Sequence, residues 1–192
     1  GVSCGGAESS SQDVAQMADE ADQFLMSLSD EQRARATFDF ESDERVRFHF
    51  VPPEVFERHG LPLKEMSAEQ RDRAHDLLRT GLSQSGYLTA TEIIEIEAIL
   101  QAMEAMEGGG QFSRDPELYY VAVFGTPSTD GTWAWRFEGH HLSLHFTIVD
   151  GGITVSAPTF LAASPAVVTE GRGAGLRPLG ALEDAGHALL ES

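Results

Sequence analysis

Residues 133–157 read WAWRFEGHHLSLHFTIVDGGITVSA, and this stretch decides the fold class. Aromatic side chains alternate with smaller or charged ones over 133–138, and apolar side chains alternate with polar ones over 141–149. A period of two is typical of a β-strand with one buried face. Asp150-Gly151 is a strong signal for a type I′ hairpin turn before a further strand over 153–157. The stretch therefore predicts consecutive antiparallel strands.

Helical periods dominate the chain before these strands. Apolar residues recur at spacings of three and four over 12–28, and capping boxes at Ser29, Ser67 and Thr89 each predict the start of a helix. The predicted elements outside the opening stretch are helices over 12–28, 29–36, 67–82, 89–106 and 182–190 and strands over 45–51 and 118–124. The sequence therefore predicts an α+β fold in which N-terminal helices pack on an antiparallel meander sheet of about four to five strands. Residues 12–192 are expected to form a single domain.

The charge balance limits the partners. The 192 residues include 13 Lys and Arg against 31 Asp and Glu, which gives a formal net charge of −18. A nucleic-acid surface requires a basic patch, so we expect no nucleic-acid partner. No apolar run approaches the roughly 18 residues of a membrane span, so we expect no transmembrane segment. The small-molecule substrate cannot be read from the composition.

The N-terminus carries the only cysteine, Cys4, in the stretch GVSCGG at 1–6. A small residue, a cysteine and a following Gly/Ser-rich segment look like the start of a mature bacterial lipoprotein. We therefore predict a lipid anchor at Cys4, a flexible tether over 1–11 and export to the periplasm, cell envelope or medium. An incidental cysteine in a cytoplasmic protein is the alternative.

Polar side chains of the predicted strands suggest a site. His141 and His145 alternate with core residues on one strand, and the neighbouring strand brings Arg136 and Glu138 to the same face. Strand geometry places His140 on the opposite face from His141. It also separates His141 from His145 by about 13 Å, too far to share one metal. The face is therefore either solvated, covered by a partner, or a site that combines imidazole, carboxylate and guanidinium groups.

Five separated motifs agree, in order, with one known family. These are LPLKEM at 61–66, RDPELY at 114–119, FG at 124–125, WAWRFEGHHLSL at 133–144 and GLRPL at 175–179. Over residues 25–190 the chain resembles the bacterial and fungal family called domain of unknown function 3500. The resemblance implies no activity. It implies that the characteristic residues of the family are Arg136, Glu138, His140, His141 and His49. It also implies that Asn is usual where this chain has His145. Relatives continue beyond this length, so the resemblance implies that this chain is a fragment or a short member.

Two hypotheses follow from these residues. In the first, the chain is a metal-dependent or acid–base enzyme of the bacterial envelope. Its transition-metal ligands are then His49, His140 and His141, and its catalytic groups are His141, His140, Glu138 and Arg136. In the second, the chain is a non-catalytic envelope module for binding or assembly, and a partner covers the sheet face.

Overall fold

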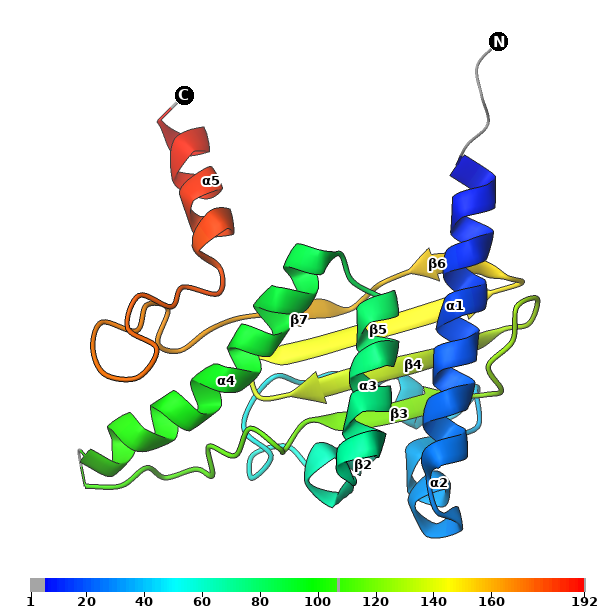
Figure 1. The fold of residues 1–192 in the computed structure, drawn as a ribbon, viewed down its shortest axis with the longest axis horizontal. Helices are drawn as coiled ribbons and strands as arrows, with labels where there is room; N and C mark the ends of the chain where they lie inside the picture. The colour runs from blue at the N-terminus through cyan, green and yellow to red at the C-terminus, as the bar shows by residue number, and fades with distance from the viewer. Residues whose placement is uncertain (1–5, 107, 192) are drawn as a thin grey trace.

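The chain folds into a twisted sheet with helices across one face (Figure 1). The computed structural model describes residues 6–106 and 108–191, so the predicted lipid anchor at Cys4 lies outside the described residues. The α-helices are α1 (Gly6–Ser27), α2 (Asp30–Ala36), α3 (Ala68–Thr80), α4 (Gln84–Met106) and α5 (Gly180–Leu190). The strands are β1 (Thr37–Phe38), β2 (Leu61–Pro62), β3 (Tyr120–Phe124), β4 (Trp133–Gly139), β5 (Leu142–Val149), β6 (Gly152–Val155) and β7 (Thr159–Leu161). Two short 3₁₀ helices occupy Asp43–Val46 (η1) and Leu63–Glu65 (η2).

The centre of the sheet is the predicted meander. Strands β3, β4, β5 and β6 lie side by side in chain order, each antiparallel to the next. The α+β class and the antiparallel sheet are therefore confirmed. The sheet is larger than predicted because three short strands join it: β1 runs parallel to β3, β2 also pairs with β3, and β7 pairs with β5. Helices are also not confined to the N-terminal half, since α5 follows the sheet and stands apart from it (Figure 1).

The predicted strand over 45–51 is wrong. Its first residues belong to η1, where the Ser42 side chain accepts a hydrogen bond from the Glu44 N–H, and Val46 is 68% exposed. The alternation of aromatic residues there has a different cause. The Phe48 ring lies 5.8 Å from the His145 ring and the Phe50 ring stacks on Phe160, so both side chains pack without their backbone joining a ladder.

Two of the three predicted capping boxes form. Ser29 with Gln32 opens α2, and Ser67 with Gln70 opens α3, each with both reciprocal hydrogen bonds. The third prediction is wrong because α4 begins five residues before Thr89, whose hydroxyl instead donates to the Pro178 carbonyl. Helix α1 also begins at Gly6, earlier than the predicted start and within the segment expected to be a tether.

The main core lies between the helices and one face of the sheet. Fully buried aliphatic residues of α1 and α3 meet the aromatic residues of β4 and β5, as expected for a helix layer on a sheet. Trp135 stacks on Phe146 with ring centroids 4.3 Å apart, and Trp133 is completely buried. Both tryptophans are thus core residues, which leaves the other sheet face to carry the polar groups.

The polar sheet face is covered by the chain itself. We call residues 43–59 the strap; they comprise η1 and most of the segment that leads to β2, and they lie over the second face of β4 and β5 through contacts such as Glu44 with Arg136 and Phe48 with His145. Arg136, Glu138, Ser143 and His145 are each at most 6% exposed beneath it. A solvated face is therefore wrong for these residues, and the cover is neither water nor a partner chain. Antiparallel sheets commonly leave one face to solvent, but in this chain the strap packs on that face.

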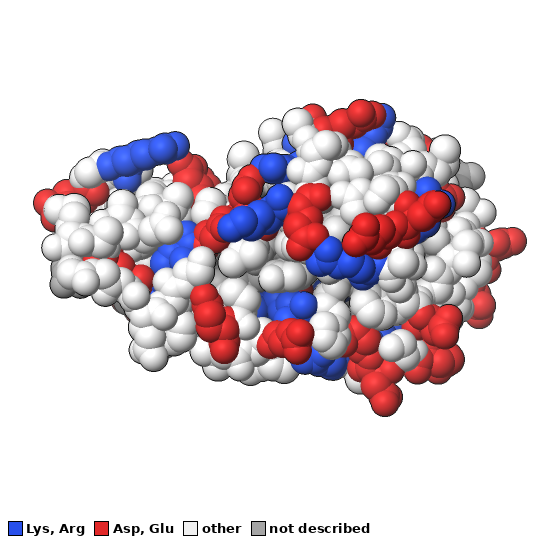
Figure 2. Space-filling model, turned by 90° about the horizontal axis from the view of Figure 1, so that it is seen from below, with Lys and Arg blue, Asp and Glu red and all other residues white. Residues whose placement is uncertain are grey.

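Basic and acidic groups lie close together on the surface. Figure 2 shows Lys and Arg side chains among Asp and Glu side chains on the face seen from below. Exposed ion pairs in the described residues include Lys64 with Asp115 and Arg177 with Glu183. Such pairs contribute little to stability. Within the described residues, no helix combines the length and apolar character needed to cross a membrane.

Candidate metal centre

The two adjacent histidines form the turn between β4 and β5. Strand β4 ends at Gly139 and β5 begins at Leu142, so His140 and His141 belong to neither strand. His141 has a φ of 61°, in the left-handed region, and its ring stacks on the His140 ring with centroids 3.7 Å apart. The prediction that the two side chains point to opposite faces is wrong, because strand alternation stops at the turn.

Four hydrogen bonds hold the backbone of this turn. The His141 N–H donates to the Phe50 carbonyl of the strap, and its carbonyl accepts from the Ala162 N–H, both at 2.9 Å. The buried Tyr119 hydroxyl donates to the His140 carbonyl at 2.9 Å. Arg58 donates to the Gly139 carbonyl at 3.0 Å. A non-glycine residue with positive φ is strained, and surrounding contacts of this kind are what maintain it.

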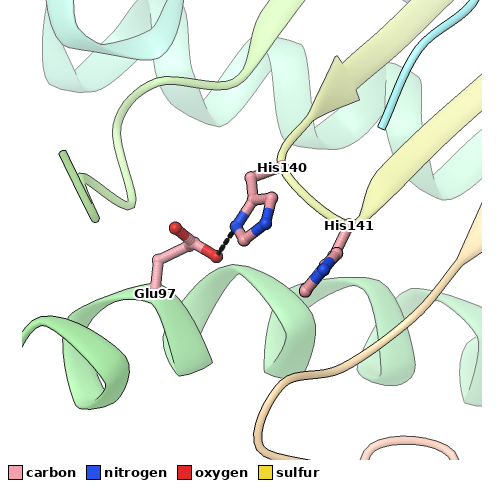
Figure 3. A group of neighbouring side chains, drawn as sticks. All are labelled: Glu97, His140 and His141. Carbon is pink, nitrogen blue, oxygen red and sulfur yellow. Dashed lines mark hydrogen bonds and ion pairs between the residues drawn. The ribbon is translucent and has the colours of Figure 1, made fainter. Parts of the chain in front are cut away.

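Glu97 of α4 completes a cluster with the two histidines (Figure 3). The residue Glu97 is 2% exposed, and its Oε1 lies 2.5 Å from His140 Nδ1. One oxygen or nitrogen atom of each of Glu97, His140 and His141 lies within 4.8 Å of the others. Sequence reasoning missed Glu97. The available signal was its position, since it interrupts the buried face of α4 that Ile93 and Ile96 define.

The electrostatic environment keeps His141 neutral. Burial, and secondarily the neighbouring His140 and Arg114, lower the pKa of His141 to about 4. A neutral imidazole has a free lone pair at neutral pH, which is the form that binds metals. Arg114 comes close to the cluster, with Nη1 3.4 Å from His140 Nδ1.

Two imidazoles and one carboxylate are a ligand set suited to Zn²⁺ or Fe²⁺. With bond lengths of about 2.0–2.2 Å, a tetrahedral or octahedral ion holds its ligand atoms roughly 3–3.5 Å apart. On binding a metal, Glu97 Oε1 and His140 Nδ1, now 2.5 Å apart, would move slightly apart. Ligand atoms of the cluster that now lie up to 4.8 Å apart would move closer together. The ligand atoms are close enough for a shared ion, and the two stacked rings would rotate to direct their lone pairs at it, so the cluster is a candidate metal centre.

His49, the third predicted ligand, is not part of this cluster. Its Nδ1 accepts hydrogen bonds from the N–H groups of Phe50 and Val51, and its ring packs 4.6 Å from the Phe56 ring. The strap therefore brings its backbone to the histidine turn through the Phe50 carbonyl, while the His49 ring is held by its own segment. Glu97 occupies the place in the cluster that the prediction assigned to His49.

Arg136 and Glu138 belong to a separate buried network. Arg136 Nη2 contacts Glu44 Oε1 at 2.7 Å, and Nε contacts Glu138 Oε1 at 2.9 Å. Its Nη1 and Nη2 also donate to the carbonyls of Glu44, Arg47 and His59. Burial raises the pKa of Glu138, although Arg136 and Arg58 act against the rise. Both terminal nitrogens of Arg136 donate hydrogen bonds, and its Nε is buried against Glu138 without a hydrogen bond of its own. These residues attach the strap to the sheet and are not available to a substrate.

His145 gives a pH-dependent test of the covered face. Burial, and secondarily Arg136, lower its pKa to about 3 from about 6.5 in the unfolded chain. The unfolded state therefore binds more protons between pH 6.5 and 3, so the contribution to stability is complete above pH 6.5 and is lost as the pH falls. Replacing His145 by Asn, the residue expected from the family resemblance, removes this proton uptake and retains a polar group beside Ser143.

We expect the free energy of unfolding of wild type to fall more steeply between pH 7 and pH 4 than that of His145→Asn, by on the order of 2–3 kcal/mol. Urea denaturation at the two pH values measures the difference. Other titrating groups are common to both proteins and cancel in the comparison. Equal losses in the two proteins would show that His145 is not held neutral by the strap.

The comparisons with known proteins agree with the sequence resemblance. A family model described as "Protein of unknown function (DUF3500)" matches residues 10–192, which is nearly the whole chain. No curated protein and no solved structure matches the chain.

Proposed function

Because the chain belongs to the DUF3500 family of proteins of unknown function, its chemistry has to be inferred from its own residues, and we propose that it is a transition-metal-dependent enzyme. Glu97, His140 and His141 hold the metal in this proposal. The observation that carries it is the convergence of a carboxylate and two imidazoles, supplied by a helix and a tight turn, within 4.8 Å.

The burial of the cluster supports a functional role. Glu97 is 2% exposed and His140 is 8% exposed, and a carboxylate in such a place is unfavourable without a partner. Both groups also lie on rigid elements, because α4 carries Glu97 and four hydrogen bonds hold the histidine turn. A preorganised ligand set of this kind is what a catalytic metal requires.

The metal, when bound, would act as a Lewis acid and lower the pKa of a coordinated water to about 7. The chain's own residues supply the rest. His141 is partly exposed, so solvent reaches the cluster from its side. The Tyr119 hydroxyl and the strap carbonyl of Phe50 fix the backbone from which both rings extend.

Acid–base catalysis without a metal is the second candidate, and the Glu97–His140 contact favours it. A carboxylate 2.5 Å from Nδ1 orients an imidazole, which leaves Nε2 to exchange protons with a substrate. In the metal proposal His141 is a ligand of the metal, whereas acid–base catalysis by Glu97 and His140 does not require it. Substitution of His141 therefore separates the two.

The envelope location remains part of the proposal and rests on the residues around Cys4. The alternative of a non-catalytic assembly module was motivated by a sheet face that needs a cover. Since the strap covers Arg136, Glu138 and His145, that motivation no longer applies to this face.

The test is metal binding by protein purified without an affinity tag or chelator. We expect about one Zn²⁺ or Co²⁺ per chain in wild type, and an affinity at least about 100-fold lower in His141→Ala, because a lost ligand costs at least as much as a lost supporting group. His187→Ala, which removes an exposed histidine from α5, is the matched control and should bind like wild type. Unchanged affinity in His141→Ala, or no binding by wild type, would refute the metal proposal.

A further inference from the structure

We propose that Arg114 makes the Glu97–His140–His141 cluster selective for substrates that carry a carboxylate or phosphate group. The inference deepens the proposed function and rests on it. Arg114 lies in the segment between α4 and β3, which folds back so that the guanidinium approaches the histidine turn. Its side chain is 11% exposed.

A second carboxylate of α4 fixes the orientation of Arg114. Glu104 lies two helical turns after Glu97, and therefore on the same face of α4. Arg114 Nε contacts both carboxylate oxygens of Glu104, at 3.1 and 3.2 Å, and Nη2 contacts Oε1 at 2.8 Å. Burial opposes ionisation of Glu104, but the hydrogen bonds from Arg114 are the larger effect and lower its pKa. Because Nε and Nη2 contact Glu104, only Nη1 of the guanidinium faces the cluster.

The contacts of His140 Nδ1 decide what Nη1 can do. Nη1 lies 3.4 Å from His140 Nδ1, and Glu97 Oε1 lies 2.5 Å from the same nitrogen. With a metal bound through Nδ1, the lone pair of that nitrogen points at the ion, and without a metal the Glu97 carboxylate occupies the same nitrogen, so in neither case is Nδ1 free to accept from an arginine. Among the hydrogen bonds of the described residues, Nη1 is thus left with a donor directed at the cluster and no acceptor. A ligand oxygen placed there would satisfy it.

The charges favour an anion as that ligand. A divalent metal and the Arg114 guanidinium together outweigh the carboxylates of Glu97 and Glu104 by one positive charge, with both imidazoles neutral. Two adjacent cations repel each other unless an anion lies between them. A carboxylate or phosphate oxygen that contacts the metal and Nη1 provides that charge, and charge-assisted hydrogen bonds to arginine are among the stronger ones in proteins.

Because the whole chain is strongly negative, only groups close to a bound anion can favour its binding. A net charge of −18 repels anions at long range. At physiological ionic strength this field is screened beyond about 8 Å, so a group within hydrogen-bond distance of the ligand decides affinity. Arg136, which the sequence placed among the catalytic groups, lies under the strap with both terminal nitrogens hydrogen-bonded and its Nε 2.9 Å from Glu138 Oε1. Arg114 takes its place.

The experiment measures anion binding to the cobalt-loaded protein. Inorganic phosphate and acetate are titrated while the visible spectrum of bound Co²⁺ is recorded. We expect both anions to change the spectrum of wild type, and the dissociation constant for phosphate to rise at least about 10-fold in Arg114→Gln. Arg114→Lys should recover part of the affinity. Arg172→Gln, which removes an 88% exposed arginine side chain 3.9 Å from Glu95 of α4, is the charge-matched control and should behave like wild type.

The outcomes separate this inference from the proposed function. If Co²⁺ binds but neither anion changes the spectrum, or if Arg114→Gln binds phosphate as well as Arg172→Gln does, the anion inference is refuted and the metal proposal stands. If wild type does not bind Co²⁺, the metal proposal fails, and phosphate is titrated against the metal-free protein while the His140 ring nitrogens are followed by NMR. A phosphate response that Arg114→Gln abolishes supports the inference, and no response refutes it.

Discussion

Replacing Arg136 by Met is expected to lower the free energy of unfolding by about 3–5 kcal/mol, the range for removing one partner of a buried ion pair. Arg136 is 1% exposed and contacts two carboxylates, those of Glu44 and Glu138. Methionine fills much of the same volume but neutralises neither carboxylate. The variant would therefore hold two buried acids with one cation removed and several strap carbonyls without their donor.

Chemical denaturation at pH 7 measures the loss, and an exposed arginine provides the control. Arg35 is 44% exposed at its side chain and pairs with Glu65, so Arg35→Met should cost no more than about 1 kcal/mol. Adding Glu44→Gln and Glu138→Gln to Arg136→Met should recover part of the stability, because the unpaired charges are then gone. A loss in Arg136→Met no larger than in Arg35→Met would contradict our description of the network as buried.

Replacing Gly139 by Ala is expected to damage both the fold and the metal centre. A methyl group at this position would overlap Cδ1 of the Tyr119 ring. That ring is fully buried and its hydroxyl holds the His140 carbonyl, so it cannot move without releasing the histidine turn. We expect a loss of about 1–3 kcal/mol from overpacking. We also expect an affinity for Co²⁺ about 10–100-fold lower, as for the loss of a group that supports a metal ligand.

Two further variants separate the causes of this effect. Tyr119→Phe removes the hydroxyl without the overlap, so it should lower metal affinity with a smaller loss of stability. Gly186→Ala places a methyl in open space on α5 and should be neutral or slightly stabilising. If Gly139→Ala bound metal as tightly as Gly186→Ala does, Tyr119 would have no part in positioning the histidines.

The central strands and two capping boxes could be predicted because their signals are local. The alternation within β4 and within β5 reports directly which side chains share a face, and the Ser29 and Ser67 side chains each accept a hydrogen bond from the backbone N–H three residues later in the first turn of a helix. The same local pattern correctly put Arg136 and Glu138 on the face opposite the tryptophans. What lies over that face depends on the strap, and nothing near Arg136 in sequence reports it.

The candidate site was predicted in part for the same reason. His140 and His141 were recognised because they are neighbours in sequence, whereas Glu97 is 43 residues from His140 and comes from another element. His49 was assigned as a ligand because its segment alternates like a strand, but the alternation there reflects packing of Phe48 and Phe50. The position of Glu97 on a buried helix face is the local signal that points to it.

The strap also has a consequence for the order of folding. Its carboxylate Glu44 binds Arg136 across 92 residues of chain, so the segment is synthesised long before the strands that it covers. Contacts between such distant residues form only after the entropy of closing a long loop has been overcome. The strap is therefore expected to dock late, onto a meander that has already formed. Substitutions in its network should then act mainly by accelerating unfolding and should leave the folding rate nearly unchanged.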